Sequence, residues 1–219
     1  YQIVKCFRDE DLRSDRQPEF TQIDCEMSFV NEEDVLNEFE KLIRFIIEKF
    51  KGIKVGAFPR ITYSEAIEKY GSDKPDIRFG MEFGNLTKVA HGKNFKIFDS
   101  QEIVLGISVP NGASFSRKQI DDLIEFSKSH EEGANAIVWV KYDEQGNFKS
   151  SVDKFFNSKD LSMWAKILVC KPGDLMLVIS GQKTEVYKQL SLLRIEVANR
   201  LELKNNKEFA PFWVTDFPL

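Results

Sequence analysis

The sequence is poor in cysteine, glycine and proline, and it has no long apolar run. Its 219 residues include 3 Cys, 12 Gly and 7 Pro. So little Gly and Pro excludes a collagen-like repeat, and no run approaches the roughly 18 apolar residues that a membrane span needs. The cysteines, Cys6, Cys25 and Cys170, are odd in number and lack the spacing of a metal site, which favours a reduced, cytoplasmic compartment.

An excess of basic residues and a phosphate-binding glycine loop are also missing. Lys and Arg number 31 against 35 Asp and Glu, a net charge of −4, whereas a general nucleic-acid coat is normally basic. A local basic face is still allowed. No Gly-x-x-x-x-Gly-Lys occurs, which excludes a Walker-type loop. His91 and His130 have no other potential metal ligands at suitable spacing in the sequence. We therefore expect surface histidines and no metal site.

The aromatic content is high: 19 Phe and 3 Trp supply ample surface to bury, which excludes a disordered chain. Residues 1–7 and 20–30 alternate apolar and polar side chains around the charged loop 8–18. This pattern predicts a long antiparallel hairpin. We expect Cys6 and Cys25 to be buried on its neighbouring strands.

Two helices are expected next. Asn31 with Asp34 is a helix start, and Gly52 is a typical helix end. An apolar stripe on this helix predicts core packing; its members are Val35, Phe39, Leu42, Ile43, Ile46 and Phe50. The capping box Thr62-x-x-Glu65 begins a second helix that ends at Gly71. The loop 72–78 that follows is expected to be rigid and polar, outside the core.

Residues 80–206 have a different texture. Strands are predicted at 102–109, 136–142 and 175–179, and helices at 116–129, 161–169 and 184–201, after a polar loop at 85–99. Residues 209–217 then return to a strand pattern. The sequence therefore predicts an α+β fold with domains 1–79, 80–206 and 207–219, in which a smaller α/β domain is inserted into an antiparallel sheet with flanking helices.

A polar face is the most informative feature of the hairpin. Gln22, Asp24 and Glu26 fall on one strand face by period-two alternation, and Arg8 lies at the end of the opposite strand. One interpretation is a solvated sheet face. The other is a preformed site, in which an arginine binds an anion while carboxylate and amide groups bind an ammonium or a hydroxyl.

The string FRDEDLRSDRQPEFTQIDCEMSF at 7–29 resembles motif 2 of the bacterial-type aspartyl-tRNA synthetases, which are class II enzymes. The similarity continues in FPRITYSEAIEKYGSDKPDIRFGMEF at 58–83 and ends with FAPFWVTDFPL at 209–219. The middle block resembles the GAD insertion domain of that family, most clearly in PNGASFSRKQIDDL at 110–123. The resemblance covers essentially the whole chain and implies part of a class II antiparallel sheet that carries this insertion.

The resemblance also implies residue roles. Arg8 matches the catalytic arginine that holds the ATP α-phosphate and contacts the aspartate carboxylate. The other implied ATP-binding residues are Asp9, Glu10 and Gln17, and the aspartate pocket would include Gln22 and Asp24. The loop at 12–15 would meet the tRNA acceptor end; the implied contacts are Glu10, Arg13, Ser14 and Arg16. For Arg13 and Arg16 a solvated loop stays open, and Lys74 and Asp76 either approach tRNA or brace the pocket.

The implied activity is that of an aspartate–tRNA ligase: ATP and Mg²⁺ activate L-aspartate, and aspartate is transferred to tRNA(Asp). The family implies a homodimer without a membrane partner. Motif 1, the motif 3 arginine and the anticodon-binding barrel are not found in the sequence. We therefore expect a central piece of such an enzyme that does not charge tRNA by itself. The alternative is an insertion that binds tRNA or a partner without catalysis.

Overall fold

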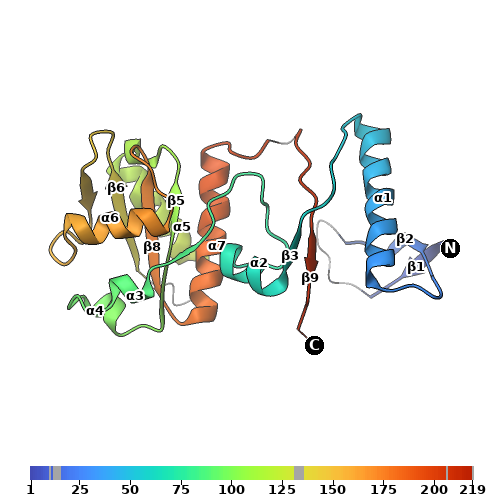
Figure 1. Ribbon diagram of the computed structural model, residues 1–219, viewed down its shortest axis with the longest axis horizontal. Helices are drawn as coiled ribbons and strands as arrows, with labels where there is room; N and C mark the ends of the chain where they lie inside the picture. The colour runs from blue at the N-terminus through green and yellow to red at the C-terminus, as the bar shows by residue number, and fades with distance from the viewer. Residues whose placement is uncertain (10, 12–15, 131–135, 206, 219) are drawn as a thin grey trace. The chain divides into compact units, whose positions relative to one another are not determined.

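The computed structural model describes residues 1–9, 11, 16–130, 136–205 and 207–218. These residues form two compact units, Tyr1–Ala57 and Phe58–Leu219, which are described separately (Figure 1). The units part after Ala57, whereas the predicted domains part after residue 79. Compact units are defined by contacts, whereas an inserted domain is defined by evolutionary origin. The division into 1–79, 80–206 and 207–219 therefore stays a prediction.

The first unit consists of a hairpin and one long helix. Strands β1 (Gln2–Phe7) and β2 (Glu19–Asp24) pair antiparallel, so the predicted second strand at 20–30 ends early. Helix α1 (Glu32–Lys51) begins with the expected capping box between Asn31 and Asp34. It ends at Gly52, whose φ of 68° is left-handed and suits glycine.

No described residue of the first unit is fully buried. On α1, Val35, Phe39, Leu42 and Ile46 are half-buried as the stripe predicts. Ile43 and Phe50, which the stripe also included, are 38% and 75% exposed. The reason is that a two-stranded hairpin is too small to cover the whole apolar face of a twenty-residue helix.

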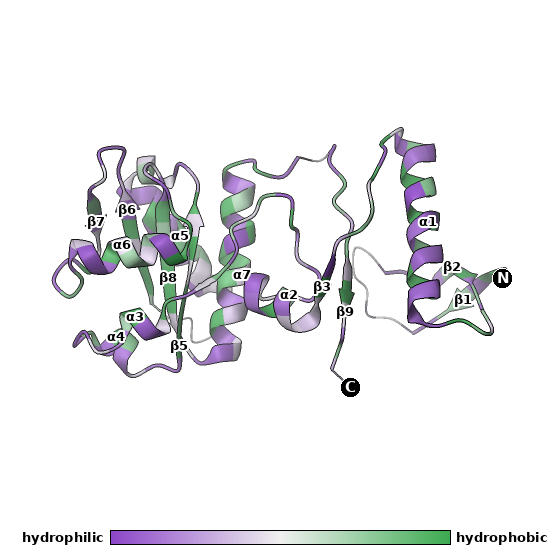
Figure 2. Cartoon of the chain, in the orientation of Figure 1, coloured by the Kyte–Doolittle hydropathy of each residue, from purple (hydrophilic) through white to green (hydrophobic). Residues whose placement is uncertain are grey.

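The second unit is built on a five-stranded sheet with the order β4-β5-β8-β6-β7, in which every pair is antiparallel. Its strands are β4 (Gly84–Asn85), β5 (Ile103–Val109), β6 (Ile137–Tyr142), β7 (Phe148–Ser150) and β8 (Leu175–Gly181). The central strands β5, β6 and β8 are the most hydrophobic part of the unit (Figure 2). The alternation of strands and helices agrees with the prediction, and the α+β class is confirmed.

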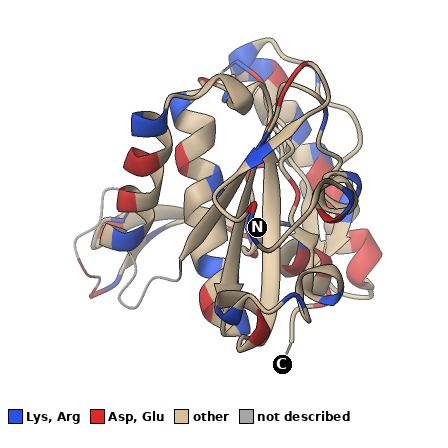
Figure 3. Ribbon diagram, turned by 90° about the vertical axis from the view of Figure 1, so that its left-hand side faces the viewer, with Lys and Arg blue, Asp and Glu red and all other residues tan. Residues whose placement is uncertain are grey.

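Helices cover both faces of this sheet. One hydrophobic cluster joins Leu105, Trp139 and Leu177 to α5 (Arg117–His130) and α7 (Lys183–Arg200). The other joins Val104, Val138 and Val178 to the opposite layer, whose helices are α3 (Thr87–Ala90), α4 (Lys96–Asp99) and α6 (Ser158–Ile167). Charged side chains lie mainly on the helices and connections (Figure 3). A single 3₁₀ turn, η1 (Gly112–Ser114), precedes α5.

The predicted loop at 85–99 is wrong, because it contains β4, α3 and α4. Each of these helices has only four residues, which is too short for a periodic pattern. Tertiary burial forms them instead: Leu86, Ala90 and Phe98 are fully buried.

The last strand returns to the start of the second unit. Strand β9 (Trp213–Thr215) pairs parallel with β3 (Arg60–Thr62), and α2 (Tyr63–Tyr70) follows β3 with the expected Thr62–Glu65 capping box. The predicted strand at 209–217 is therefore correct in place but only three residues long. Among the described residues, no helix is both long and apolar enough to cross a membrane.

Candidate active site

The hairpin register brings the predicted polar residues onto one face. The directly opposite pairs are Gln2–Asp24, Val4–Gln22 and Cys6–Phe20. Paired residues point to the same side of a sheet, and side chains alternate along each strand. Gln22 and Asp24 therefore share a half-buried face, whereas the opposite face presents exposed Ile3, Phe7 and Ile23.

Arg8 extends this face by one step beyond β1. Its backbone N–H donates to the carbonyl of Pro18 at 2.8 Å, and its guanidinium carbon lies 5.2 Å from the centroid of the Phe20 ring. A cation over an aromatic face is stabilised by about 0.5–1 kcal/mol at an exposed site. Phe20 thus holds the guanidinium over this face. The sequence analysis missed Phe20, although its alternation with Gln22 and Asp24 identifies it.

The opposite end of the face carries a carboxylate. The side-chain amide of Gln2 donates to Oδ2 of Asp24 at 3.1 Å, and the Cys6 thiol donates to Oε1 of Gln22 at 3.7 Å. Gln2 is a second residue that the sequence analysis missed. In the described part of the chain no Lys or Arg forms an ion pair with Asp24. A positively charged ligand can therefore supply its counter-ion.

The polar groups of this face follow one another in a fixed order along the strand. Same-face neighbours on a strand are about 6.6 Å apart, so a guanidinium over Phe20, the Gln22 amide and the Asp24 carboxylate form a short row. Two such steps separate Phe20 from Asp24, about 13 Å along the strand, so the Arg8 guanidinium and the Asp24 carboxylate lie toward opposite ends of the row. The arrangement offers a cation, an amide and an anion in that order.

The other predicted site residues lie at the ends of the connecting loop or outside the description. Asp9, Arg16 and Gln17 are exposed, and Glu26 is exposed beyond the end of β2. Glu10, Arg13 and Ser14 lie outside the described residues. The roles of all six predicted loop residues stay predictions.

A metal site is not evident in the side chains that the structure describes. Among them, no group of three or more His, Cys, Asp or Glu could hold an ion. Mg²⁺ prefers oxygen ligands and usually reaches nucleotide enzymes on the substrate phosphates.

The loop at 72–78 braces the fold. Arg78 holds Asp76 through two charge-assisted bonds, Nε to Oδ1 at 2.9 Å and Nη2 to Oδ2 at 2.6 Å. These bonds lower the pKa of Asp76. Arg78 also donates to the carbonyl of Asn205 at 3.0 Å. Lys74 is exposed, and Pro75 is the one buried residue of this loop. No residue of 72–78 belongs to either hydrophobic cluster, as expected for a loop outside the core.

Arg194 on α7 fixes the same loop from inside. It is 1% exposed, its guanidinium donates to the carbonyls of Asp76, Gly80 and Met81, and it lies 4.1 Å from the centroid of the Phe79 ring. Burial lowers its pKa to about 10. Since carbonyls rather than a carboxylate receive its bonds, Arg194 is a structural clamp, which the sequence alone gave no reason to single out.

The histidine and cysteine expectations need correction. His91 is half-buried, and its Nε2 is buried without a hydrogen-bond partner among the described residues. The side chain of His130 is outside the description. Cys6 is half-buried but Cys25 is exposed, because β2 ends at Asp24. Burial raises the pKa of Cys170 to about 11, so this thiol is not an activated nucleophile.

Comparison with known proteins places the chain in a family. The family model "tRNA synthetases class II (D, K and N)" matches residues 1–219. The chain is 57% identical over 219 residues to the aspartate–tRNA ligase of Flavobacterium psychrophilum and 49% identical over 219 residues to that of Azobacteroides pseudotrichonymphae. It is 47% identical over 221 residues to that of Phocaeicola vulgatus.

Each of these matches covers 100% of the chain but only 38% of the relative's length. The extent of the match, together with a hairpin that presents Arg8 and Asp24 on one face, confirms the resemblance found in the sequence. The chain belongs to the class II tRNA synthetase family (D, K and N).

Proposed function

We propose that this chain carries the amino-acid activating face of an aspartate–tRNA ligase. The reaction joins L-aspartate to ATP, gives aspartyl-adenylate and pyrophosphate, and then transfers aspartate to the 3′ end of tRNA(Asp). The observation that carries the proposal is the shared face of Arg8, Gln22 and Asp24 in a chain 57% identical to an aspartate–tRNA ligase. The relatives favour this proposal over an insertion without catalysis.

In the first step an oxygen of the aspartate α-carboxylate attacks the α-phosphorus of ATP. A P–O bond forms to the carboxylate, and the bond to pyrophosphate breaks. The attacking group is already deprotonated, so no general base is required. The obstacle is repulsion between two anions, and the permanently charged guanidinium of Arg8 can bridge both with bidentate geometry. Catalysis is then positioning and charge stabilisation.

Asp24 and Gln22 would orient the amino acid. The Asp24 carboxylate pairs with the α-ammonium, which keeps the carboxylate of the substrate directed at Arg8. Gln2 holds one oxygen of Asp24 through its amide, and this bond fixes the carboxylate before the substrate arrives. Preorganisation of this kind lowers the ordering cost of binding.

In the second step the terminal ribose hydroxyl of tRNA attacks the carbonyl carbon of the adenylate, and AMP leaves. The hairpin loop would meet the acceptor end through Glu10, Arg13, Ser14 and Arg16, while Asp9, Glu10 and Gln17 would contact ATP, which carries Mg²⁺. The working enzyme would be a cytoplasmic homodimer.

Aspartate-dependent exchange of pyrophosphate into ATP tests this proposal without tRNA. It is measured on the protein made from its complete reading frame. Arg8→Ala should lower the exchange rate by about 10²–10³-fold, the usual effect of removing one charge-stabilising donor. Arg8→Lys should fall between, since it keeps the charge but loses the planar fork.

Lys5→Ala is the matched control. Lys5 lies on the same strand but on the opposite face, in an exposed ion pair with Glu19 at 2.7 Å, so exchange should be unchanged. A folded unmutated protein without aspartate-dependent exchange would overturn the proposal. So would an Arg8→Ala protein that exchanges at the unmutated rate.

A further inference from the structure

Helix α5 begins with an unusual charge pattern. The first turns of the other long helices carry acids that complement the helix dipole, such as Glu32, Glu65, Asp160 and Glu185. The first turn of α5 has no acid and instead begins with Arg117 and Lys118. Positive charges at this end oppose the helix dipole. The arrangement is unfavourable unless an anion is nearby.

A second unfavourable arrangement lies on the neighbouring strands. Lys141 on β6 and Lys149 on β7 are directly opposite each other, and like charges in this position destabilise a sheet. Lys149 is exposed and Lys141 is half-buried. Burial, and the charge of Lys149, lower the pKa of Lys141.

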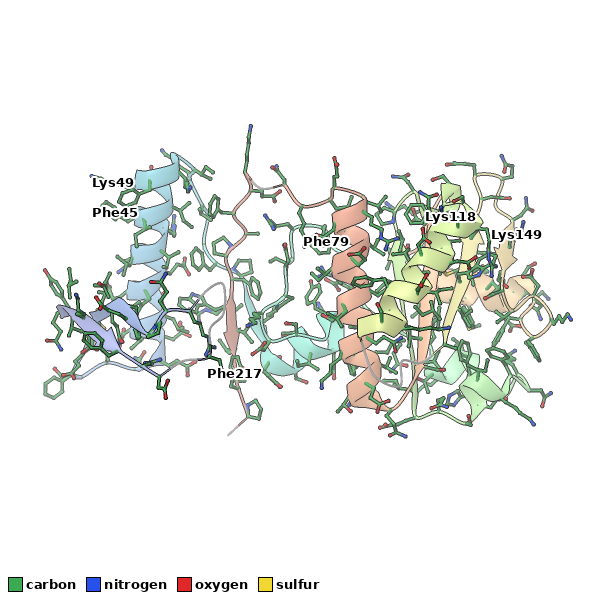
Figure 4. All side chains as sticks on the ribbon, turned by 180° about the vertical axis from the view of Figure 1, so that it is seen from behind. Phe45, Lys49, Phe79, Lys118, Lys149 and Phe217 are labelled. Atoms are coloured by element: carbon green, nitrogen blue, oxygen red, sulfur yellow. The ribbon has the colours of Figure 1, made fainter. Side chains whose placement is uncertain are left out.

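Contacts join these two features into one surface. The ammonium of Lys141 donates to the carbonyl of Phe115, two residues before α5. The guanidinium carbon of Arg117 lies 5.3 Å from the centroid of the Trp139 ring, and Trp139 shares a strand face with Lys141. Figure 4 labels Lys118 on α5 and Lys149 on β7, both in the upper part of the unit. We call this surface the basic face; its members are Arg117, Lys118, Lys141 and Lys149.

Of the four members of the basic face, only Arg117 is paired with an acid within the described residues. Arg117 pairs with Asp121 at 3.0 Å. Within the described ranges, none of the three lysines forms an ion pair. Local rules are usually broken where function requires it, and here two electrostatic rules are broken side by side. An anion bound at this surface would relieve both.

We propose that the basic face binds the sugar–phosphate backbone of RNA, in addition to the catalysis proposed above. Lysine ammonium groups are point charges that suit phosphate oxygens. Opposed strand residues lie about 5 Å apart, so Lys141 and Lys149 can share one phosphate or contact two neighbours. Trp139, the aromatic residue of this surface, is only 7% exposed, which leaves no apolar anchor for a peptide. The identification of this RNA as tRNA rests on the proposed function.

Binding of fluorescent tRNA to the 219-residue chain tests the inference, with anisotropy read over a series of salt concentrations. The double variant Lys118→Glu/Lys149→Glu reverses two exposed charges. It should weaken binding by about tenfold or more and reduce the salt slope by about 2, since each lost phosphate contact removes roughly 0.7–0.9 from the slope. Its thermal midpoint should be unchanged, because both side chains are exposed.

Lys159→Glu/Lys166→Glu is the matched control. It makes the same change of charge on two exposed lysines of α6, which covers the opposite face of the sheet. Binding and salt slope should stay near those of the unmutated chain. Equal losses in the two variants, or no loss in the basic-face variant, would overturn the inference. The inference would also be overturned if the basic-face variant kept its affinity for tRNA and lost affinity only for a polyglutamate peptide.

Aspartate-dependent exchange separates this inference from the proposed function. Exchange needs no tRNA, so the basic-face variant of the complete protein should exchange at the unmutated rate. Absent exchange together with intact, face-dependent RNA binding would overturn the ligase proposal and leave the RNA-binding inference standing. If exchange is normal but the basic-face variant binds RNA as well as the unmutated chain does, the ligase proposal stands and the RNA-binding inference is overturned.

Discussion

The two compact units use their hydrophobic residues in opposite ways. Every fully buried hydrophobic side chain among the described residues lies in Phe58–Leu219. Most of these side chains fill two clusters on either side of the sheet. In Tyr1–Ala57 large apolar side chains remain exposed, among them Ile3 and Phe7 at 70% each and Phe50 at 75%. The candidate active site therefore lies on the unit in which no described residue is fully buried. Over the 38% of the relatives' length that this chain covers, the fully buried core and the candidate site lie on different units.

The difference shows what local interactions can do alone. The hairpin register and the caps of α1 shape a first unit in which the described residues are at most half-buried. Such structure is ordered by hydrogen bonds that individually contribute only about 0.5–1.5 kcal/mol. The second unit adds the hydrophobic term, which dominates folding. Mutations should therefore have large effects on stability in the second unit and small ones in the first.

The largest stability effect is expected at Trp164. It is 0% exposed, and its ring centroid lies 4.7 Å from that of Phe156 and 5.9 Å from that of Phe98. Trp164→Ala should lower the free energy of unfolding by about 3–5 kcal/mol in urea titrations. Trp164→Phe should cost much less, since Nε1 has no hydrogen-bond partner among the described residues.

Phe45→Ala is the counterpart in the first unit. Phe45 is 59% exposed on α1, so its removal should change the free energy of unfolding by less than about 0.5 kcal/mol. A loss at Phe45 as large as that at Trp164 would break the comparison between the units.

Arg194 should rank next. Arg194→Met keeps much of the side-chain volume but leaves the carbonyls of Asp76, Gly80 and Met81 without their donor. Each buried polar group left unsatisfied costs about 1–3 kcal/mol, so a loss of about 2–4 kcal/mol is expected by urea titration. Arg194→Lys should recover part of it, because an ammonium can still donate to one or two carbonyls. An Arg194→Met protein as stable as the unmutated chain would show that the loop needs no clamp.

Asp76 gives a pH-dependent effect of smaller size. Its pKa is lowered below the ordinary value of 3.8, chiefly by its bonds to Arg78. The unfolded state therefore binds the proton of Asp76 more tightly than the folded state does. The ion pair stabilises the folded state above about pH 4, and this contribution is lost as the pH falls through the lowered pKa. The stability difference between the unmutated chain and Asp76→Asn should be largest at neutral pH and should shrink below pH 4. A difference that stays constant across this range would contradict the ion pair.

Val169 offers the smallest effect, with the opposite sign. It follows α6 with a φ of 52° and is 76% exposed. A β-branched residue is strained in this conformation. Val169→Gly should raise the free energy of unfolding by about 0.5–1 kcal/mol, because the relieved strain exceeds the greater freedom of glycine in the unfolded chain. Val169→Ala should give less. Destabilisation by glycine would mean that Val169 makes contacts that offset its strain.

The sequence predicted the locally encoded features well. Both capping boxes and the left-handed glycines Gly52 and Gly71 are where their residue types indicate. The longer helices and strands of the second unit, α5, α6, α7, β5, β6 and β8, also lie where the periodicity predicts. Features set by tertiary contacts could not be predicted. The four-residue helices α3 and α4 and the order of the five strands depend on partners distant in sequence.

The candidate site was partly predictable for the same reason. Period-two alternation put Gln22 and Asp24 on one face, and the register confirms that they share it with Arg8 and Phe20. The contact of Gln2 with Asp24 depends on which residues lie opposite each other across the hairpin. A loop of unknown geometry does not fix this register, so Gln2 could not be singled out from the sequence.

The separation of chemistry from stability is tested most directly by two variants of the complete protein, each measured for aspartate-dependent exchange and for its thermal midpoint. We predict that Arg8→Ala loses exchange at an unchanged midpoint. Trp164→Ala should lower the thermal midpoint. At temperatures well below that midpoint, its folded molecules should exchange pyrophosphate at the unmutated rate. If Arg8→Ala lowers the midpoint as much as Trp164→Ala does, or keeps its exchange, the account is contradicted.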